Sequence, residues 1–262
     1  MKLELYQVDT FTDKVFSGNP ACVVPLIEWL DDSLLLSIAK ENAVAETAFF
    51  VHEKEKFHLR WFTPEIEIDL CGHATLAAAH CLKTILNHQE NIITFTTMSG
   101  ELTVNTAGDV YTLNFPSRKP EPTILPEIIK SSLNIQPQEV LKARDYVLVY
   151  ETEDDIKNIS IDRHILDTIN LDPGGIVVTA QGTHVDFVSR FFTPQASILE
   201  DPVTGSSHCS LIPYWAEKLN KNILSASQLS ERGGSLLCEN NGARVLISGK
   251  AKTYSTGTLW LD

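Results

Sequence analysis

Three ionisable side chains at separate points of the chain are candidates for proton transfer. Glu46 lies in the apolar stretch 42–50 (NAVAETAFF), His73 follows Gly72, and Asp201 stands in a loop before a proline. Burial among apolar residues raises the pKa of a carboxyl group towards neutrality, where a general acid/base can take a proton and return it. A structural role is the alternative for each residue: a solvated strand position for Glu46, a helix-start contact for His73 and a turn for Asp201.

A thiol stands beside the same glycine. Cys71 directly precedes Gly72, and a helix N-terminus at that point would lower the thiol pKa and favour a nucleophile or proton carrier. A small buried apolar side chain is the alternative. The five cysteines are scattered, with no C-x-x-C pair and no Cys/His group at metal-ligand spacing, so the spacing predicts neither a disulfide framework nor a metal site.

Two glycines are placed where helices should begin. Gly72 and Gly205 each open an apolar helical run, and the free N–H groups at a helix start, together with the positive end of the helix dipole, favour anions. A tight turn without a ligand is the alternative for each glycine. The pair predicts a site that holds a carboxylate from both sides.

An internal repeat connects the two glycines. The sequence RWFTP at residues 60–64 returns as RFFTP at residues 190–194, and in both copies an acidic stretch and a glycine-led helix follow. Self-similarity of this kind indicates duplicated architecture. Two such units usually face each other across a cleft, where small-molecule sites form; chance similarity is the alternative.

Hydrophobic periodicity gives a mixed chain in which strands outnumber helices. Predicted strands are 3–11, 21–26, 47–52, 57–62, 92–97, 110–115, 146–150, 175–180, 184–192, 228–232, 244–247 and 256–261, and predicted helices are 32–41, 73–86, 126–132 and 206–219. A proline-rich, charged linker at 116–126 separates two domains, 1–117 and 118–262. The predicted fold is α+β, with two pseudo-symmetric domains, each a mostly antiparallel, barrel-like sheet around a central helix.

Composition limits the partners. Hydrophobic residues make up 43% of the 262-residue chain, and the net charge is -13 without a basic stripe. Nucleic acid is therefore not expected as a partner. The sequence contains no apolar run long enough to span a bilayer and no signal-peptide pattern at its start. We expect a cytoplasmic protein that binds a small molecule.

Four motifs in combination resemble the phenazine-biosynthesis (PhzF) protein family. They are VDTF with SGNPA at residues 8–21, AETAF at 45–49, DLCGHATL at 69–76 and EDPVTGS at 200–206. The resemblance spans both halves of the chain. It implies the diaminopimelate-epimerase-like fold, isomerase chemistry without a cofactor in the cleft between the domains, and a homodimer.

The resemblance also implies roles for individual residues. Glu46 matches the catalytic acid/base of the family, which in the phenazine enzyme moves a proton between two carbons of dihydro-hydroxyanthranilate. His73 and Asp201 match cleft residues that hold and assist the substrate. Gly72 and Ser206 match positions that bind the substrate carboxylate, and Asn19 in the first motif is a further candidate contact with the substrate.

Related epimerases and racemases of this fold use two cysteines, one before each cleft glycine. Cys71 fills the first position, but Thr204 stands at the second, and its hydroxyl is no useful base near pH 7. An isomerase that relies on Glu46 is therefore favoured. An epimerase that uses Cys71 with a non-thiol partner is a second hypothesis, and a ligand-binding protein without turnover is a third.

Overall fold

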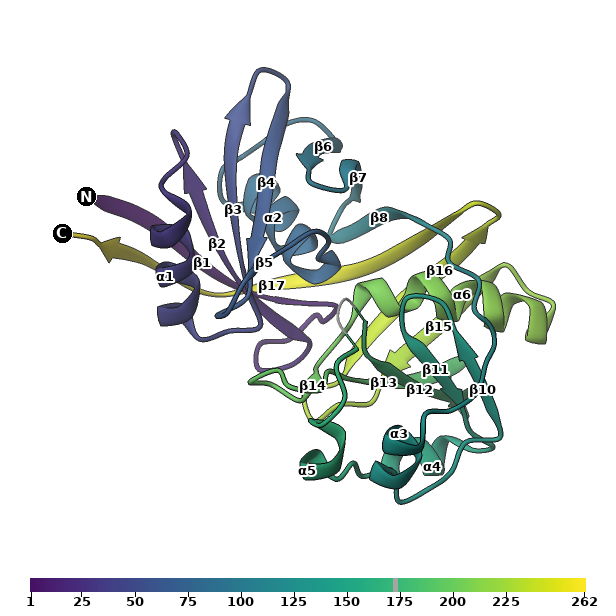
Figure 1. Cartoon of the computed structure of the whole chain (residues 1–262). Helices are drawn as coiled ribbons and strands as arrows, with labels where there is room; N and C mark the ends of the chain where they lie inside the picture. Colours follow the sequence, from purple (N-terminus) through teal and green to yellow (C-terminus); the bar gives the residue numbers. More distant parts are fainter. Residues whose placement is uncertain (172–173) are drawn as a thin grey trace. The chain divides into compact units, whose positions relative to one another are not determined.

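The computed structural model describes residues 1–171 and 174–262 (Figure 1). The chain divides into two compact units, unit 1 with residues 1–115 and 247–262, and unit 2 with residues 116–246. The sequence places 247–262 in the second domain, whereas this segment packs with unit 1. The reason is a long-range strand pairing, β17 (Arg244–Trp260) with β1 (Lys2–Thr10), which no local signal reveals. That residues 1–117 and 118–262 are separate domains stays a prediction.

Unit 1 is a closed barrel. Its strands pair in the cyclic order β1, β2, β3, β4, β6, β7, β8, β17 and back to β1. The pairs β2–β3 and β4–β6 are parallel. The pairs β1–β2, β3–β4, β6–β7, β7–β8 and β1–β17 are antiparallel. The bounds are β2 (Asn19–Leu26), α1 (Asp32–Asn42), β3 (Glu46–Glu53), β4 (Lys56–Phe62), β5 (Glu67–Ile68), β6 (Ile92–Thr97), β7 (Gly100–Ala107) and β8 (Val110–Pro116).

The central helix of unit 1 is α2 (Gly72–Thr84). Its residues are mostly Ala and Leu, which favour helix, and every residue from Gly72 to Leu82 is buried. A helix that is buried all round belongs inside a core, and α2 contacts β1, β2 and β3 of the barrel (Figure 1). The barrel thereby fixes where the first turn of α2 lies.

Unit 2 contains a sheet with the pairing order β9, β10, β11, β12, β13, β15, β16 and one buried central helix, α6 (Gly205–Leu219). The pairs β11–β12 and β13–β15 are parallel. The remaining bounds are β9 (Glu121–Pro122), α3 (Glu127–Ser132), β10 (Glu139–Lys142), β11 (Tyr146–Val149), α4 (Glu153–Asn158), α5 (Arg163–Leu166), β12 (Ile176–Gln181), β13 (Phe187–Phe192), β14 (Glu200–Asp201), β15 (Ile223–Gln228) and β16 (Gly234–Asn241).

The repeated pentapeptide has the same local structure in both units. Its first three residues end β4 in unit 1 and β13 in unit 2, and each of these strands pairs with a short acidic strand, β5 or β14. Arg60 forms a bidentate ion pair with Glu67 at 2.7 and 2.6 Å, and Arg190 forms one with Glu200 at 2.7 and 2.8 Å. Two parallel N–H···O bonds hold a carboxylate in a fixed orientation. Each arginine therefore fastens the acidic strand that precedes its central helix.

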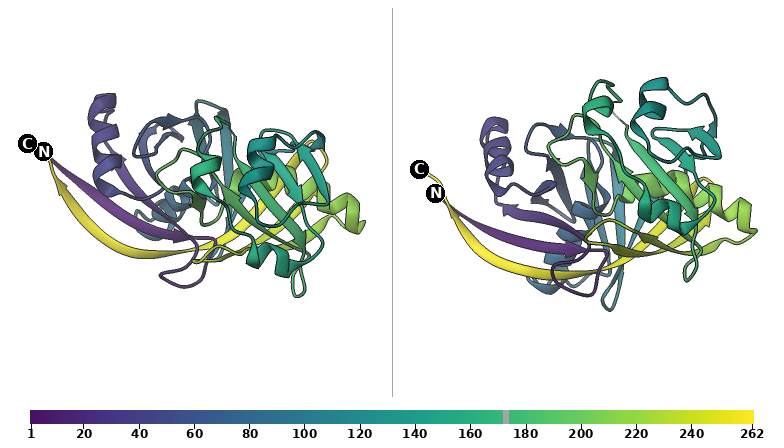
Figure 2. Two further views of the ribbon diagram at one scale, coloured as in Figure 1. Left: turned by 60° about the horizontal axis from the view of Figure 1, so that its bottom comes forward. Right: turned by 90° about the horizontal axis from the view of Figure 1, so that it is seen from below.

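The two ends of the chain lie side by side in unit 1. Figure 2 shows β1 and β17 running together to the termini, and Lys2 pairs with Trp260 in the register. Helix α1 packs its Leu35 and Ile38 against the strands beside this ribbon. In the described part of the chain, no helix has both the length and the apolar content that crossing a membrane requires.

Candidate active site

A carboxylate, an imidazole and a thiol meet at the start of α2. Glu46 is the first residue of β3, Cys71 is the N-cap of α2, and His73 lies in the first helical turn. The His73 Nε2 atom is 3.1 Å from Glu46 Oε2, and His73 Nδ1 is 3.5 Å from Cys71 Sγ. The structure thus brings Glu46 of β3 to the Cys71-Gly72-His73 segment at the start of α2, which lies farther along the chain.

Burial and mutual charge set the protonation of this cluster. Burial by itself lowers the pKa of His73, but the neighbouring Cys71 and Glu46 raise it, and the resulting pKa is well above the ordinary value. Burial and the Glu46 charge raise the pKa of the Cys71 thiol, although His73 acts in the opposite direction. Because the raised pKa of Cys71 leaves a neutral thiol at neutral pH, Glu46 is the neighbour that favours a charged His73 there, and we assign an imidazolium that faces Glu46.

This result corrects one expectation about Cys71. The position of Cys71 at a helix N-terminus predicts a lowered thiol pKa, whereas the pKa is raised. The physical reason is desolvation, because Cys71 is buried and a thiolate there would also be close to the Glu46 carboxylate. Cys71 is therefore not a thiolate at rest.

The N-terminus of α2 has the features expected of an anion site. The helix begins at Gly72, its N-cap makes no side-chain capping hydrogen bond, and its first turn contains no acidic residue. The positive end of the helix dipole and the His73 imidazolium therefore add at the same place. Binding of a substrate carboxylate at Gly72 stays a prediction.

Asn19 is held by a constrained turn of unit 1. It is the first residue of β2 and is fully buried, and its carbonyl accepts a hydrogen bond from the Thr10 hydroxyl at 2.9 Å. The preceding Gly18 has φ +68°, and a Cβ atom at this position would lie 2.0 Å from the Thr10 carbonyl oxygen. Only glycine fits there. The contact of Asn19 with a substrate stays a prediction.

Unit 2 contains the second group of predicted residues at the start of α6. Thr204 is the N-cap, Gly205 begins the helix and Ser206 follows, while Asp201 ends β14. The Thr204 hydroxyl hydrogen-bonds to the Asp201 carboxylate. Thr204 thus occupies in α6 the N-cap place that Cys71 occupies in α2. The roles predicted for Asp201, Gly205 and Ser206 stay predictions.

Sequence reasoning missed Gln228, the last residue of β15. This fully buried side chain accepts a hydrogen bond from the Thr204 backbone N–H at 2.9 Å and donates one to the Asp201 carbonyl at 2.7 Å. It therefore ties the loop between β14 and α6 to the sheet of unit 2. A single glutamine at the edge of a predicted strand gives no signal of such a role.

The predicted site residues fall into two groups. Unit 1 holds Asn19, Glu46, Cys71, Gly72 and His73, and unit 2 holds Asp201, Gly205 and Ser206. Within unit 1 the acid, the imidazole and the thiol are in contact. A shared substrate site for the two groups stays a prediction.

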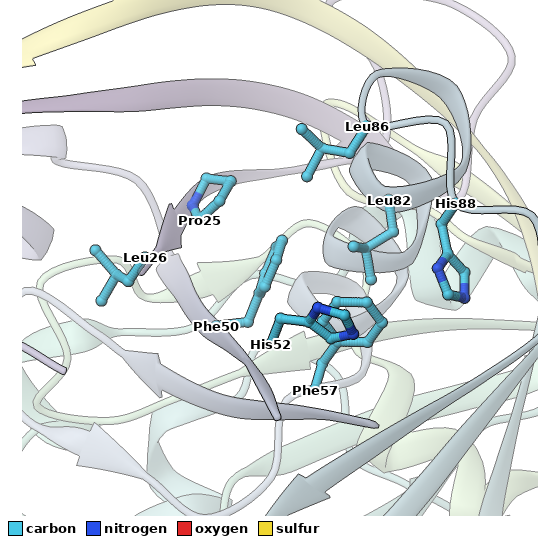
Figure 3. Close-up of a pocket in the computed structure, with 8 residues that line it drawn as sticks. All are labelled: Pro25, Leu26, Phe50, His52, Phe57, Leu82, Leu86 and His88. Carbon is cyan, nitrogen blue, oxygen red and sulfur yellow. The ribbon is translucent and has the colours of Figure 1, made fainter. Parts of the chain in front are cut away.

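A separate pocket in unit 1 lies at the other end of α2 (Figure 3). Its volume is about 320 Å³, and its walls include Leu82 of α2, Leu86 just after this helix, and the rings of Phe50 and Phe57. His52 stacks on Phe57 with ring centroids 4.7 Å apart. Apart from His52 and His88, its lining residues in the described chain are apolar, and none of them is a carboxylate.

Comparison with known proteins gives a consistent assignment. The family model described as phenazine biosynthesis-like protein matches residues 8–257. An uncharacterized isomerase of Pseudomonas aeruginosa is 48% identical over 261 residues, which is 100% of both chains. The crystal structure of a PhzF-family phenazine biosynthesis protein from Enterococcus faecalis superposes with a TM-score of 0.94 at 44% identity and covers 100% of both chains.

A more distant structure supports the fold alone. A predicted epimerase from Pseudomonas aeruginosa has a TM-score of 0.75 at 20% identity and covers 99% of this chain and 100% of its own. The fold is therefore shared with epimerase-like proteins, as expected from the sequence. The chain belongs to the phenazine biosynthesis-like (PhzC-PhzF) protein family, which is of the isomerase and epimerase type.

Proposed function

We propose that this protein is a cofactor-independent isomerase that moves a proton within a small carboxylate-bearing substrate. Glu46 takes the proton from one carbon and returns it to another. The substrate lies in a cleft between the two halves of the chain, and the starts of α2 and α6 hold its carboxylate. The observation that carries the proposal is the 3.1 Å contact between Glu46 Oε2 and His73 Nε2.

This contact suits a reversible base. A base must release its proton again, and an adjacent imidazolium can assist by donating a hydrogen bond to the substrate or to the carboxylate. The Glu46 side chain is 17% exposed and the His73 side chain 4% exposed, so Glu46 is the more accessible of the two. We therefore assign proton transfer to Glu46 and a positioning and electrostatic role to His73.

The remaining predicted residues take supporting roles in this proposal. Asp201, which is hydrogen-bonded to Thr204, orients the substrate from the second half. The amides near Gly72 and Gly205 and the Ser206 hydroxyl bind the carboxylate, because helix starts favour anions, and Asn19 contacts the substrate from the β1–β2 turn. We expect the protein to act as a homodimer, in keeping with the family resemblance.

The proposal is tested by proton exchange with solvent. The full chain is incubated in deuterated water with a panel of small unsaturated and amino carboxylates, and deuterium incorporation is followed by NMR. We expect exchange and isomerisation with at least one compound, and the Glu46→Gln variant should lower the rate by about 10²–10⁴-fold. Equal rates for both proteins would exclude Glu46 as the base.

An epimerase that uses Cys71 is the second candidate, and the 3.5 Å contact of Cys71 Sγ with His73 Nδ1 favours it. In that reaction deuterium would enter at one stereocentre without movement of a double bond, and Cys71→Ala would abolish it. Thr204 stands at the matching N-cap of α6, and a hydroxyl is a poor base near neutral pH. For this reason the isomerase is the first candidate.

A further inference from the structure

We propose that Glu46, Cys71 and His73 form a binding site for a zinc ion, and that the bound ion inhibits the protein. One potential ligand atom of each residue lies within 4.8 Å of those of the other two. A carboxylate oxygen, a thiolate sulfur and an imidazole nitrogen are the donor types that zinc accepts. The spacing of these donors along the chain predicts no metal site, because Glu46 comes from β3, whereas Cys71 and His73 lie at the start of α2.

The distances require only a small adjustment. Zinc lies about 2.0–2.3 Å from oxygen, nitrogen and sulfur ligands, so the ligand atoms of a tetrahedral ion are about 3.3–3.8 Å apart by the same geometry. His73 Nε2 and Glu46 Oε2 are already 3.1 Å apart. Cys71 Sγ is 3.5 Å from the other ring nitrogen, His73 Nδ1, so the side chains must rotate until one nitrogen of His73 faces both Cys71 and Glu46.

Two of the donor atoms have unused bonding capacity. Glu46 Oε2 and His73 Nε2 are buried atoms, and within the described residues neither makes a hydrogen bond. Their 3.1 Å contact is an ion pair whose angles do not meet those of a hydrogen bond. Buried polar atoms without a partner are costly. A zinc ion bound by Glu46 Oε2 and His73 Nε2 would give both atoms a partner, and its binding would release the His73 Nε2 proton and the Cys71 thiol proton to solvent.

The number and type of ligands select the metal. Within the described chain the cluster has three members, and three protein ligands leave a fourth position for water or an added anion. The thiolate favours zinc, cobalt or cadmium over magnesium and calcium. Because the positive end of α2 opposes a cation, we expect weaker binding than at a structural zinc site, and hence reversible occupancy.

Inhibition follows from the identity of the ligands, and this part of the inference rests on the proposed function. An ion held by Glu46 and His73 occupies the base and its neighbour, so proton transfer stops until a chelator removes the ion. The binding itself does not depend on any reaction. Loss of binding and loss of the proposed reaction are therefore distinguishable.

Cobalt titration of the full, reduced protein tests the site without a substrate. We expect one equivalent of Co²⁺ to give a near-ultraviolet thiolate-to-cobalt charge-transfer band and the visible bands of a four-coordinate ion, and one equivalent of Zn²⁺ to remove both. Magnesium at the same concentration should have no effect. The absence of a charge-transfer band with the wild-type protein would overturn the proposal.

Matched variants locate the ligands. Cys71→Ala should abolish the charge-transfer band, whereas Cys81→Ala, which removes another buried thiol of the same helix, should retain it. Glu46→Gln keeps the shape of a partly exposed side chain and should weaken cobalt binding at least about tenfold, so it tests the site even if Cys71→Ala fails to fold. A band that survives in Cys71→Ala, or unchanged affinity in Glu46→Gln, would contradict the proposal.

Discussion

His73 Nε2 lies 3.1 Å from Glu46 Oε2, at the point where β3 and α2 both begin. The contact joins an imidazole with a raised pKa to the proposed base, and it lies wholly within unit 1. The protonation of His73 is therefore the first property to measure.

The three buried histidines should differ in charge at neutral pH. Cys71 and Glu46 outweigh burial and raise the pKa of His73, while burial lowers the pKa of His80 and of His208 to about 4. Nitrogen NMR at pH 7 should show an imidazolium for His73 and neutral rings for the other two. A neutral ring at His73 would contradict the assigned charges.

The same charge should make the stability contribution of His73 depend on pH. A histidine whose pKa is raised by folding adds stability that is fully present below the unfolded pKa of about 6.5 and is lost as the pH rises through the folded pKa. The free energy of unfolding lost in His73→Gln should thus be larger near pH 6 than near pH 10. A loss that is equal at both pH values would argue against a charged His73.

His208 offers a control of opposite sign. Because its folded pKa is lowered to about 4, the unfolded chain binds more protons between about pH 4 and 6.5. The stability of the wild type relative to His208→Gln should therefore rise with pH across that window. Denaturant unfolding at several pH values measures both variants.

Gly18→Ala should disturb the turn that holds Asn19. A Cβ atom at Gly18 would lie 2.0 Å from the Thr10 carbonyl oxygen, whereas Gly108 has a similar φ of +61° with no atom within 4 Å. Gly108→Ala should cost about 1–2 kcal/mol from the backbone conformation alone, and Gly18→Ala should cost clearly more. Equal losses in thermal or denaturant unfolding would show that the close contact is unimportant.

The two arginine–glutamate pairs should contribute similarly to stability. Arg60 and Glu67 have side chains 16% and 23% exposed, and Arg190 and Glu200 have side chains 15% and 24% exposed. Loss of one charged partner in Glu67→Gln or Glu200→Gln should lower the free energy of unfolding by about 1.5–3 kcal/mol. The exposed ion pair of Lys130 with Glu127 supplies the control. Lys130→Gln should change the free energy of unfolding by less than about 0.5 kcal/mol. A small effect at either buried pair would argue against an equivalent role in the two units.

Local periodicity predicted the central helices well. Helix α2 begins at Gly72 and α6 at Gly205, each within one residue of the prediction. The run after Gly72 is rich in Ala and Leu, which favour helix, and the run after Gly205 is apolar with helical periodicity. The predicted strand 228–232 is wrong, since β15 ends at Gln228. Strand β15 has the sequence ILSASQ. After Ile223 and Leu224 it contains only small or polar residues, so its alternation of apolar and polar residues is weak.

Strand β17 shows where local patterns fail. The sequence predicts two strands, 244–247 and 256–261, with a loop between them, but β17 runs unbroken from Arg244 to Trp260. Gly249 suggests a turn, yet it serves packing, because a Cβ atom there would lie 2.4 Å from the Phe11 ring. Such a constraint comes from a residue far away in the chain.

For the site, too, the residues could be predicted from the local sequence, whereas their contacts could not. The sequence singled out Glu46, His73 and Cys71 as separate candidates, but their mutual contacts depend on the barrel that places β3 beside α2. The raised thiol pKa also depends on this burial. The resemblance to a family supplied roles for these residues, and the barrel supplies their distances.

The most direct test of the central claim compares two variants on one exchanging substrate. We expect Glu46→Gln to lose deuterium exchange by at least about 10²-fold, and Cys71→Ala, checked for folding by circular dichroism, to keep a rate within about tenfold of the wild type. Retained exchange in Glu46→Gln together with its loss in Cys71→Ala would contradict the account and identify the thiol as the proton carrier.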